Sequence, residues 1–194
     1  MNFLKNIYIW TLKKAEHKDA KWYLSLISFA ESSFFPIPPD ILLIPMALAS
    51  KTKALFYAFI CTLSSVLGGI FGYAIGYFFF NSIGLYIVEF YHLENSFSIF
   101  ENYYKEFGIL IVLGAGITPF PYKFITIASG VFGLNIYLFV IVSIIGRGLR
   151  FYLIAILLYF FGEKIKLFID KYFNILSITF FVLLVGSVFI IRFL

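Results

Sequence analysis

The chain has 194 residues, of which 62% are hydrophobic and 13% charged, and its formal net charge is +5. This composition is too apolar for a soluble domain and predicts an all-α integral membrane protein built as one helical unit. The positive charge then bears on orientation and anionic lipids, and we expect no nucleic-acid partner. The single cysteine, Cys61, excludes an internal disulfide and a multi-cysteine metal site. We expect no metal and no cofactor.

Residues 1–23 are predicted to form an amphipathic segment at the membrane interface. Residues 3–12 are apolar but too short to cross a bilayer, and the lysines that follow them are flanked by Trp10 and Trp22. A frayed basic tail is the alternative. We expect no cleavable signal peptide, because the lysines follow the first apolar run and no small-residue cleavage site is present.

Residues 24–50 form an apolar segment that polar residues and prolines interrupt. Within it, residues 29–40 carry two carboxylates and three prolines: Glu31, Asp40, Pro36, Pro38 and Pro39. Proline ends a helix but is tolerated in a first turn, so one helix should end near Pro36 and another begin just after it. Lysines flank the segment on both sides, and the positive-inside bias places both flanks in the cytoplasm together with the N-terminus. The sequence therefore predicts a re-entrant helical hairpin.

Residues 54–80 carry no charge and are long enough to cross a membrane with some tilt. Gly68, Gly72 and Gly76 recur every four residues, which predicts one smooth helical face where another backbone approaches closely. A groove for a lipid tail is the alternative interpretation.

Residues 81–106 form the longest polar stretch, in which several glutamates face only one lysine, Lys105. The lack of positive charge predicts the non-cytoplasmic side, and the many aromatic residues suggest amphipathic helices at the headgroups. His92 has no companions at metal-ligand spacing, so we interpret it as a solvated loop residue.

Residues 107–134 repeat the proline pattern of the first predicted hairpin. Pro119 and Pro121 again form Pro-x-Pro in an apolar run, and Lys123 is the only charge. A shift of 83 residues aligns Pro36 with Pro119 and also Asp40 with Lys123. Paired interruptions in two halves of a chain indicate a transporter's binding site at the membrane midplane. Because Pro-x-Pro is a short pattern, coincidence remains the alternative.

Residues 135–161 form the next predicted span and carry Gly146-Arg147-Gly148-Leu149-Arg150. Two arginines three residues apart share a helix face, and an arginine deep in a membrane usually faces the protein interior or a partner. Arg150 lies nearer the end of the span, where snorkelling to the interface is the alternative. A charged cytoplasmic loop is expected at 163–171, and a third span at 172–191 within the C-terminal segment 163–194.

At these positions the sequence resembles the DedA family of small membrane proteins, which share the VTT or SNARE-associated domain. The residues that carry the resemblance are Glu31, the two Pro-x-Pro tips, Asp40, Lys123 and Gly-Arg-Gly-Leu-Arg. The runs Thr-Pro-Phe-Pro-Tyr-Lys-Phe, Ala-Ser-Gly-Val-Phe-Gly and Gly-Arg-Gly-Leu-Arg-Phe look closest to its YqaA-like branch. The resemblance covers residues 24–162. It implies two facing re-entrant hairpins in an inverted repeat, in the cell membrane.

The resemblance also implies a function in moving lipids across the bilayer. Bacterial relatives recycle polyprenyl phosphate or flip phospholipids, coupled to protons or sodium, and eukaryotic relatives scramble phospholipids. The family's membrane acids correspond to Glu31 and Asp40, and its basic residues to Lys123, Arg147 and Arg150. The better-known branch has an arginine shortly before the second tip proline, where this chain has Gly116-Ile117-Thr118. That departure leaves the lipid substrate open.

A flippase or scramblase for a phosphate-bearing lipid is thus the predicted function. One alternative is a structural membrane protein whose buried charges pair with each other, Glu31 or Asp40 with Lys123 or Arg147. The other is a membrane enzyme of lipid phosphate metabolism. Such an enzyme usually needs histidine, and His17 and His92 both lie in polar stretches. We therefore place the enzyme below the transporter.

The charged residues receive separate expected roles. Lys123 is predicted in the first turn of a half-helix, where the electropositive helix start calls for an anion. Asp40 from the matching tip is the expected anion at rest, and a lipid phosphate replaces it during transport, with Arg147 supplying a bidentate fork. A permanent Asp40–Lys123 pair is the alternative. Glu31 is expected to be the better proton carrier, because no helix dipole stabilises its anion.

Overall fold

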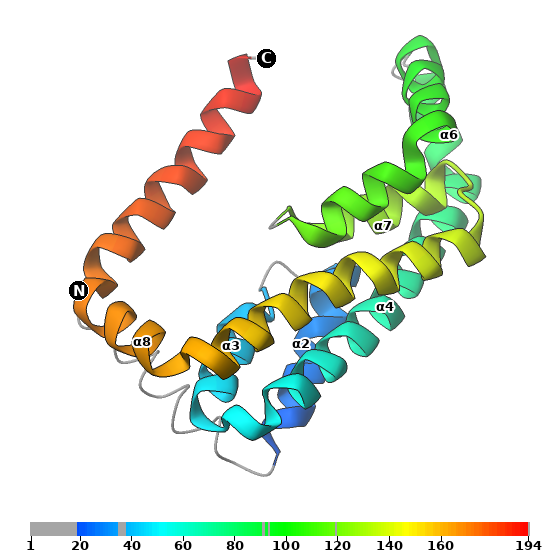
Figure 1. The fold of residues 1–194 in the computed structure, drawn as a ribbon. Helices are drawn as coiled ribbons and strands as arrows, with labels where there is room; N and C mark the ends of the chain where they lie inside the picture. Colours follow the sequence, from blue (N-terminus) through cyan, green and yellow to red (C-terminus); the bar gives the residue numbers. More distant parts are fainter. Residues whose placement is uncertain (1–18, 35–37, 91, 93, 119, 194) are drawn as a thin grey trace.

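The computed structural model describes residues 19–34, 38–90, 92, 94–118 and 120–193, and all elements in this part of the chain are helical (Figure 1). The expected all-α class is confirmed. The elements are α2 (Ala20–Ser33), α3 (Asp40–Ala49), η1 (Lys51–Lys53), α4 (Ala54–Phe79), η2 (Phe80–Gly84), α5 (Leu85–Phe90), α6 (Glu94–Ile117), α7 (Tyr122–Val131) and α8 (Ile136–Phe193). Of the predicted interfacial segment 1–23, residues 1–18 lie outside the described residues, and residues 20–23 belong to α2.

Within the described residues, two stretches of helix are long and apolar enough to cross a membrane: Lys51–Phe79, and Ile136–Gly162 within α8. They coincide with the spans predicted at 54–80 and 135–161. The third predicted span, at 172–191, is not one of these two stretches and stays a prediction.

Both proline-rich tips separate two helices. α2 ends at Ser33 and α3 begins at Asp40, while α6 ends at Ile117 and α7 begins at Tyr122. Pro39 and Pro121 occupy the N-cap positions of α3 and α7, with φ of −65° and −62°. These values match the φ that the proline ring fixes, so each proline is compatible with the start of the helix that follows it. Pro36 and Pro119 lie outside the described residues.

α4 and α2 run parallel and in close contact. A Cβ on Gly68 would lie 2.1 Å from the Phe29 carbonyl oxygen, and one on Gly72 would lie 3.1 Å from that of Ser32. The contacts advance along both helices in the same sense. α3 follows α2 and precedes α4 in the sequence, and it runs in the opposite direction to both. The beginning of α2 and the end of α3 therefore lie toward the same end of the bundle.

α7 also runs parallel to α4. A Cβ on Gly69 would lie 3.7 Å from the Tyr122 ring, and one on Gly76 would lie 2.0 Å from the Ile127 carbonyl oxygen. Backbone of α2 and α7 therefore fills the face formed by Gly68, Gly72 and Gly76. The predicted close helix packing fits these contacts, whereas an open lipid-tail groove along this face does not.

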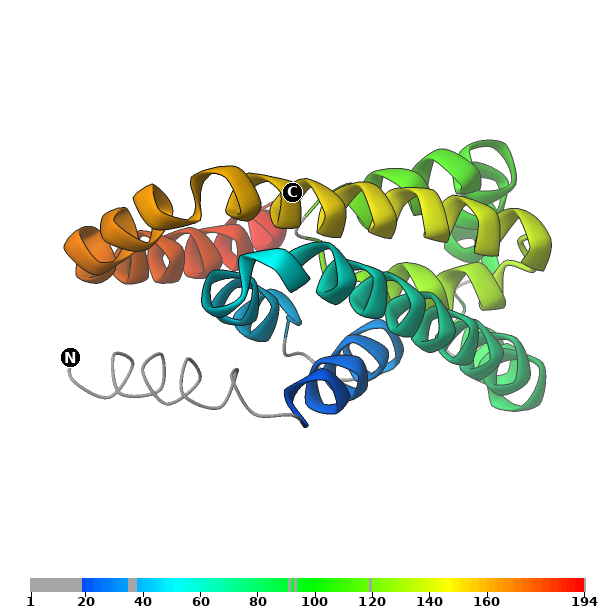
Figure 2. The same cartoon turned by 60° about the horizontal axis from the view of Figure 1, so that its bottom comes forward.

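α8 runs antiparallel to α4, and Figure 2 shows α4 lying between α8 and α2. Arg147 of α8 bonds Ser65 of α4, whereas the earlier Phe139 lies next to the later Gly69. α3 runs parallel to α8, as the pairs Asp40–Arg150 and Leu48–Gly162 show.

α6 likewise runs parallel to α8. Gly108 lies against Leu134, and Gly116 against Gly146. The helices α2, α3 and α4 thus alternate in direction, and α6, α7 and α8 alternate in the opposite sense.

Two buried apolar clusters lie on either side of the charged residues described below. One joins α2, α3, α4 and α8 and includes Leu24, Leu43, Cys61 and Phe151. The other joins α6, α7 and α8 around Tyr122, with members Val112, Ala115 and Phe139. Cys61 is fully buried, as its apolar context predicts.

Two predicted boundaries are wrong. The charged stretch 163–171 is not a loop, because α8 continues through it to Phe193 and bends along its orange part in Figure 1. Glu163, Lys164 and Lys166 are good helix formers, and neither proline nor glycine follows Gly162 before residue 186. The division at residue 106 is also wrong, since α6 runs without a break from Glu94 to Ile117.

Candidate functional site

Arg147 is the most deeply buried charged residue among those that the structure describes. Its side chain is 1% exposed, although it lies near the middle of a helix that is long enough to cross a membrane. Its Nη2 donates a hydrogen bond of 2.6 Å to Oε2 of Glu31, near the end of α2, and its Nε donates one of 2.7 Å to Ser65 on α4. Three helices are thereby joined through one guanidinium group.

Further groups surround this ion pair. The Arg147 guanidinium carbon lies 5.0 Å from the ring centroid of Tyr122 and 4.7 Å from that of Phe151, within the range of cation–π attraction. Ser32 donates to Oε2 of Glu31 at 3.1 Å and shares a hydrogen bond of 2.6 Å with Ser65. The carboxylate and the guanidinium are thus charge-compensated inside the protein, as buried ions must be.

Arg150 connects the two helix breaks. Its Nη2 forms an ion pair with Oδ2 of Asp40, the first residue of α3, and its Nη1 donates 2.6 Å to the carbonyl oxygen of Thr118, just after α6. A helix start favours an anion and a helix end favours a cation, so both placements are electrostatically favourable. The first and second tips meet at this side chain.

Two buried polar atoms of the site have no hydrogen-bond partner among the described residues: Nη1 of Arg147 and Oδ1 of Asp40. One is a donor on a cation and the other an acceptor on an anion. Each would gain by meeting a complementary group, because an unpaired buried polar atom is costly. No group of three or more His, Cys, Asp and Glu side chains in the described residues is arranged to hold a metal ion.

Two proteins resemble this chain over most of its length. A protein of Haemophilus influenzae, named only as uncharacterized, is 35% identical over 192 residues, which are 99% of this chain and 100% of the relative. A second uncharacterized protein, from Histophilus somni, is 37% identical over 167 residues, covering 84% and 85% of the two chains. The chain belongs to the family of these proteins. No family model and no solved structure matches it.

In this family member, the acids and arginines that the sequence singled out come together. The pair of Glu31 with Arg147 is one that the structural alternative named, whereas Asp40 has another partner than expected. Asp40 pairs with Arg150, so its expected pairing with Lys123 is wrong. The Lys123 ammonium lies 5.4 Å from the ring centroid of Phe124, and within the described residues it makes no ion pair. Lys123 does lie in the first turn of α7, as predicted.

Arg150 has a side chain that is 13% exposed and engages both tips, which favours its expected place in the site over snorkelling to the interface. Glu31 was expected to lack help from a helix dipole, and its carboxylate is instead contacted by Arg147 and Ser32.

Sequence reasoning missed several residues of the site. Ser65, Ser32, Thr118, Tyr122 and Phe151 all contact the charged groups. Adjacent serines within an otherwise apolar span were the available signal for Ser65, since hydroxyl groups hydrogen-bond across helices in membranes. The aromatic residues carried no such signal, because the chain contains 27 phenylalanines and 14 tyrosines.

Proposed function

We propose that the protein is a DedA-like transporter that moves a phosphate-bearing lipid, a polyprenyl phosphate or a phospholipid, across the cell membrane. The observation that carries this proposal is the meeting of both helix breaks at Arg147, which is buried, and Arg150, which is partly buried, on one long apolar helix. Paired broken helices are the arrangement in which transporters build midplane sites. Guanidinium groups are well suited to phosphate because they bind its oxygens in pairs.

Helix length and direction support the proposed hairpin topology. α2 has 14 residues and α3 has 10, which correspond to about 21 Å and 15 Å of helix, less than the roughly 30 Å of the hydrocarbon core. Since α2 runs parallel to α4 and α3 returns between them, the pair would enter and leave on one side. The opposite alternation of α6, α7 and α8 supports an inverted repeat, in which the second hairpin enters from the other side.

Phosphate binding would use the unpaired donor of Arg147. Its Nη1 is buried and lacks a partner, although its other two nitrogens are engaged. A phosphate oxygen would complete this fork. Arg150, which is held by Asp40 and by the Thr118 carbonyl oxygen, would supply a second fork on exchanging one of these partners for phosphate. Lys123, at the electropositive start of α7, would attract the same headgroup.

The geometry favours Asp40 over Glu31 as the proton carrier. Glu31 lies in a closed pair with a cation that is 1% exposed, so protonating it would leave that cation uncompensated. Asp40 has one oxygen without a partner, and its side chain is more exposed, at 18%. Protonation of Asp40 would weaken its hold on Arg150 and free that guanidinium for phosphate.

A structural role is the second candidate, and the closed Glu31–Arg147–Ser65 contact favours it. In that case the charges would only hold the helices together. Substituting arginine by lysine distinguishes the two candidate functions. Lysine keeps the positive charge but lacks the planar fork that binds phosphate oxygens in pairs.

The test is lipid transport by purified protein in liposomes that contain labelled phosphatidylglycerol. We expect the wild type to move this lipid, and Arg147→Lys and Arg150→Lys to lose about tenfold or more of the rate while remaining folded. That loss is roughly the effect of one charge-assisted hydrogen bond, about 1.5–3 kcal/mol. Lys105→Gln is the matched control, because Lys105 pairs with Glu101 on an exposed helix face.

Asp40→Asn should transport without dependence on a proton gradient. If both folded arginine variants transported lipid at the wild-type rate, the proposed phosphate site at Arg147 and Arg150 would be refuted and the structural role would remain. Absence of transport by folded wild type would overturn the transporter proposal for this lipid class.

A further inference from the structure

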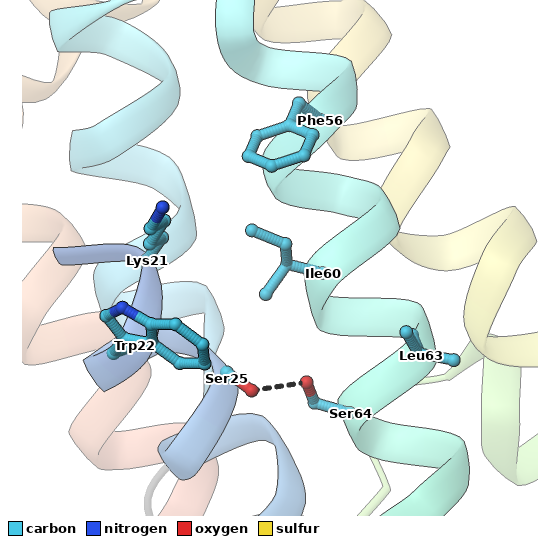
Figure 3. A pocket seen from close by; sticks show the side chains of 7 residues that line it. All are labelled: Lys21, Trp22, Ser25, Phe56, Ile60, Leu63 and Ser64. Carbon is cyan, nitrogen blue, oxygen red and sulfur yellow. Dashed lines mark hydrogen bonds between the residues drawn. The ribbon is translucent and has the colours of Figure 1, made fainter. Parts of the chain in front are cut away.

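A groove separates the beginning of α2 from the first turns of α4, and neither Arg147 nor Arg150 lines it (Figure 3). Its volume is about 240 Å³, and it opens to the surface. Figure 3 shows Lys21, Trp22 and Ser25 on the α2 side, with Phe56 and Ile60 extending from α4 toward them. The lining residues are Lys21, Trp22, Ser25, Phe56, Ile60, Leu63 and Ser64.

The groove is chemically apolar despite its two serines. Ser25 and Ser64 share a hydrogen bond of 2.7 Å, so each hydroxyl group is already engaged. Phe56 and Leu63 are 52% and 50% exposed, which leaves apolar surface on the rim. The volume lies below the roughly 300 Å³ of small-molecule sites, so the groove has room for part of a flexible molecule. A hydrocarbon chain fits these requirements, because it needs no polar partner.

The mouth of the groove carries positive charge. Lys21 is exposed, and its ammonium lies 5.7 Å from the ring centroid of Trp22. Lys51 and Lys53 precede α4 near this end and, together with Lys21, outnumber Asp19. Tryptophan is enriched at membrane interfaces, and lysines there attract anionic lipids. The mouth of the groove therefore combines a headgroup-level aromatic residue with cations.

We propose that the α2/α4 groove binds one acyl chain of an anionic phospholipid, with Lys21 holding the phosphate at its mouth. The site is separate from the two arginines of α8, and lipid binding there does not depend on transport. A lipid held in this way would cover the line along which α2 meets α4.

Fluorescence of Trp22 provides the test. The chain has two tryptophans, so Trp10→Phe leaves Trp22 as the remaining one. The protein is reconstituted into nanodiscs of phosphatidylcholine that contain a fixed fraction of brominated lipid, which quenches tryptophan on contact. Brominated phosphatidylglycerol is compared with brominated phosphatidylcholine of the same chain length.

We expect phosphatidylglycerol to quench more strongly, with an apparent binding preference of up to about fivefold, the effect of one lysine near the membrane surface. Lys21→Gln should remove most of this preference. Lys53→Gln is the matched control, because it removes a charge near the same end without altering the lining of the groove, and should keep the preference. Ile60→Phe fills the groove and should reduce quenching by both lipids.

Three results would overturn the proposal. Equal quenching by both lipids would show no headgroup recognition. Equal losses in Lys21→Gln and Lys53→Gln would show general surface attraction. Unchanged quenching in Ile60→Phe would show that the chain does not enter the groove. None of these measurements requires transport, so failure here and failure of the proposed transport function remain distinguishable.

Discussion

Removing the carboxylate of Glu31 should destabilise the protein far more than removing an exposed one. Glu31→Gln leaves the Arg147 guanidinium, which is 1% exposed, with its hydrogen bond to Ser65 but without its anion. Breaking one side of a buried ion pair costs about 3–5 kcal/mol, because the remaining charge is uncompensated. We therefore expect a loss of this size in the free energy of unfolding.

The surface pair Glu101–Lys105 gives the matched comparison. Its nitrogen and oxygen are 2.7 Å apart, close to the 2.6 Å of the Glu31–Arg147 pair, but its side chains are 35% and 64% exposed. An exposed i,i+4 pair contributes only about 0.3–0.5 kcal/mol, so Glu101→Gln should change stability by no more than that. The two ion pairs thus have nearly the same nitrogen–oxygen distance and differ mainly in how deeply they are buried.

Equilibrium unfolding in mixed detergent micelles would measure both losses. The double variant Glu31→Gln with Arg147→Met removes both charges and should recover most of the stability lost in Glu31→Gln. The reasoning would be refuted if Glu31→Gln cost no more than Glu101→Gln, or if the double variant were less stable than Glu31→Gln alone.

Two further predictions concern packing and topology. Gly76→Ala should destabilise the protein by about 1–3 kcal/mol, since the new Cβ would lie 2.0 Å from the Ile127 carbonyl oxygen. Gly114→Ala should be neutral or stabilising, because a Cβ there would meet nothing within 4 Å. Thermal unfolding of the two variants checks this, and equal effects would contradict the close approach of α4 and α7. In a Cys61→Ala background, Lys21→Cys and Lys53→Cys should react with a membrane-impermeant thiol reagent from one side of the membrane and Glu101→Cys from the other, and labelling of positions 21 and 53 from opposite sides would rule out the first hairpin.

The sequence predicted the helix ends at the two tips because proline acts locally. The ring restricts its own φ and removes one donor, whatever the rest of the fold does, and α3 and α7 indeed begin at Asp40 and Tyr122. The charged stretch 163–171 was wrongly predicted to be a loop, because charge does not act on the backbone in the way that proline does. Charge indicates exposure to water, but by itself it does not end a helix, and α8 continues through the stretch.

The sequence offered Glu31 or Asp40 with Lys123 or Arg147 as candidate pairs, but it could not decide which of these residues meet. Aligning the tips by 83 residues matched Asp40 with Lys123, yet equivalent positions in two repeats need not touch. The contacts depend instead on where α8 crosses the tips, which brings Arg150 to Asp40 and Arg147 to Glu31. These pairs are separated by 110 and 116 residues, beyond the reach of any local pattern. What could be read was that charges in apolar helices need partners inside the protein.

If the chain crosses a membrane as proposed, the long separation between Glu31 and Arg147 affects its insertion during synthesis. At roughly 5–20 residues per second, Glu31 is made about 6–23 s before the arginine 116 positions later. During this interval the carboxylate has no guanidinium to neutralise it, and burying it as an anion is costly. With the proposed topology, the α2–α3 segment would therefore wait at the interface or enter with Glu31 protonated. Its final depth would be reached only after α8 is made, so the proposed first hairpin would be among the last parts of the chain to be completed.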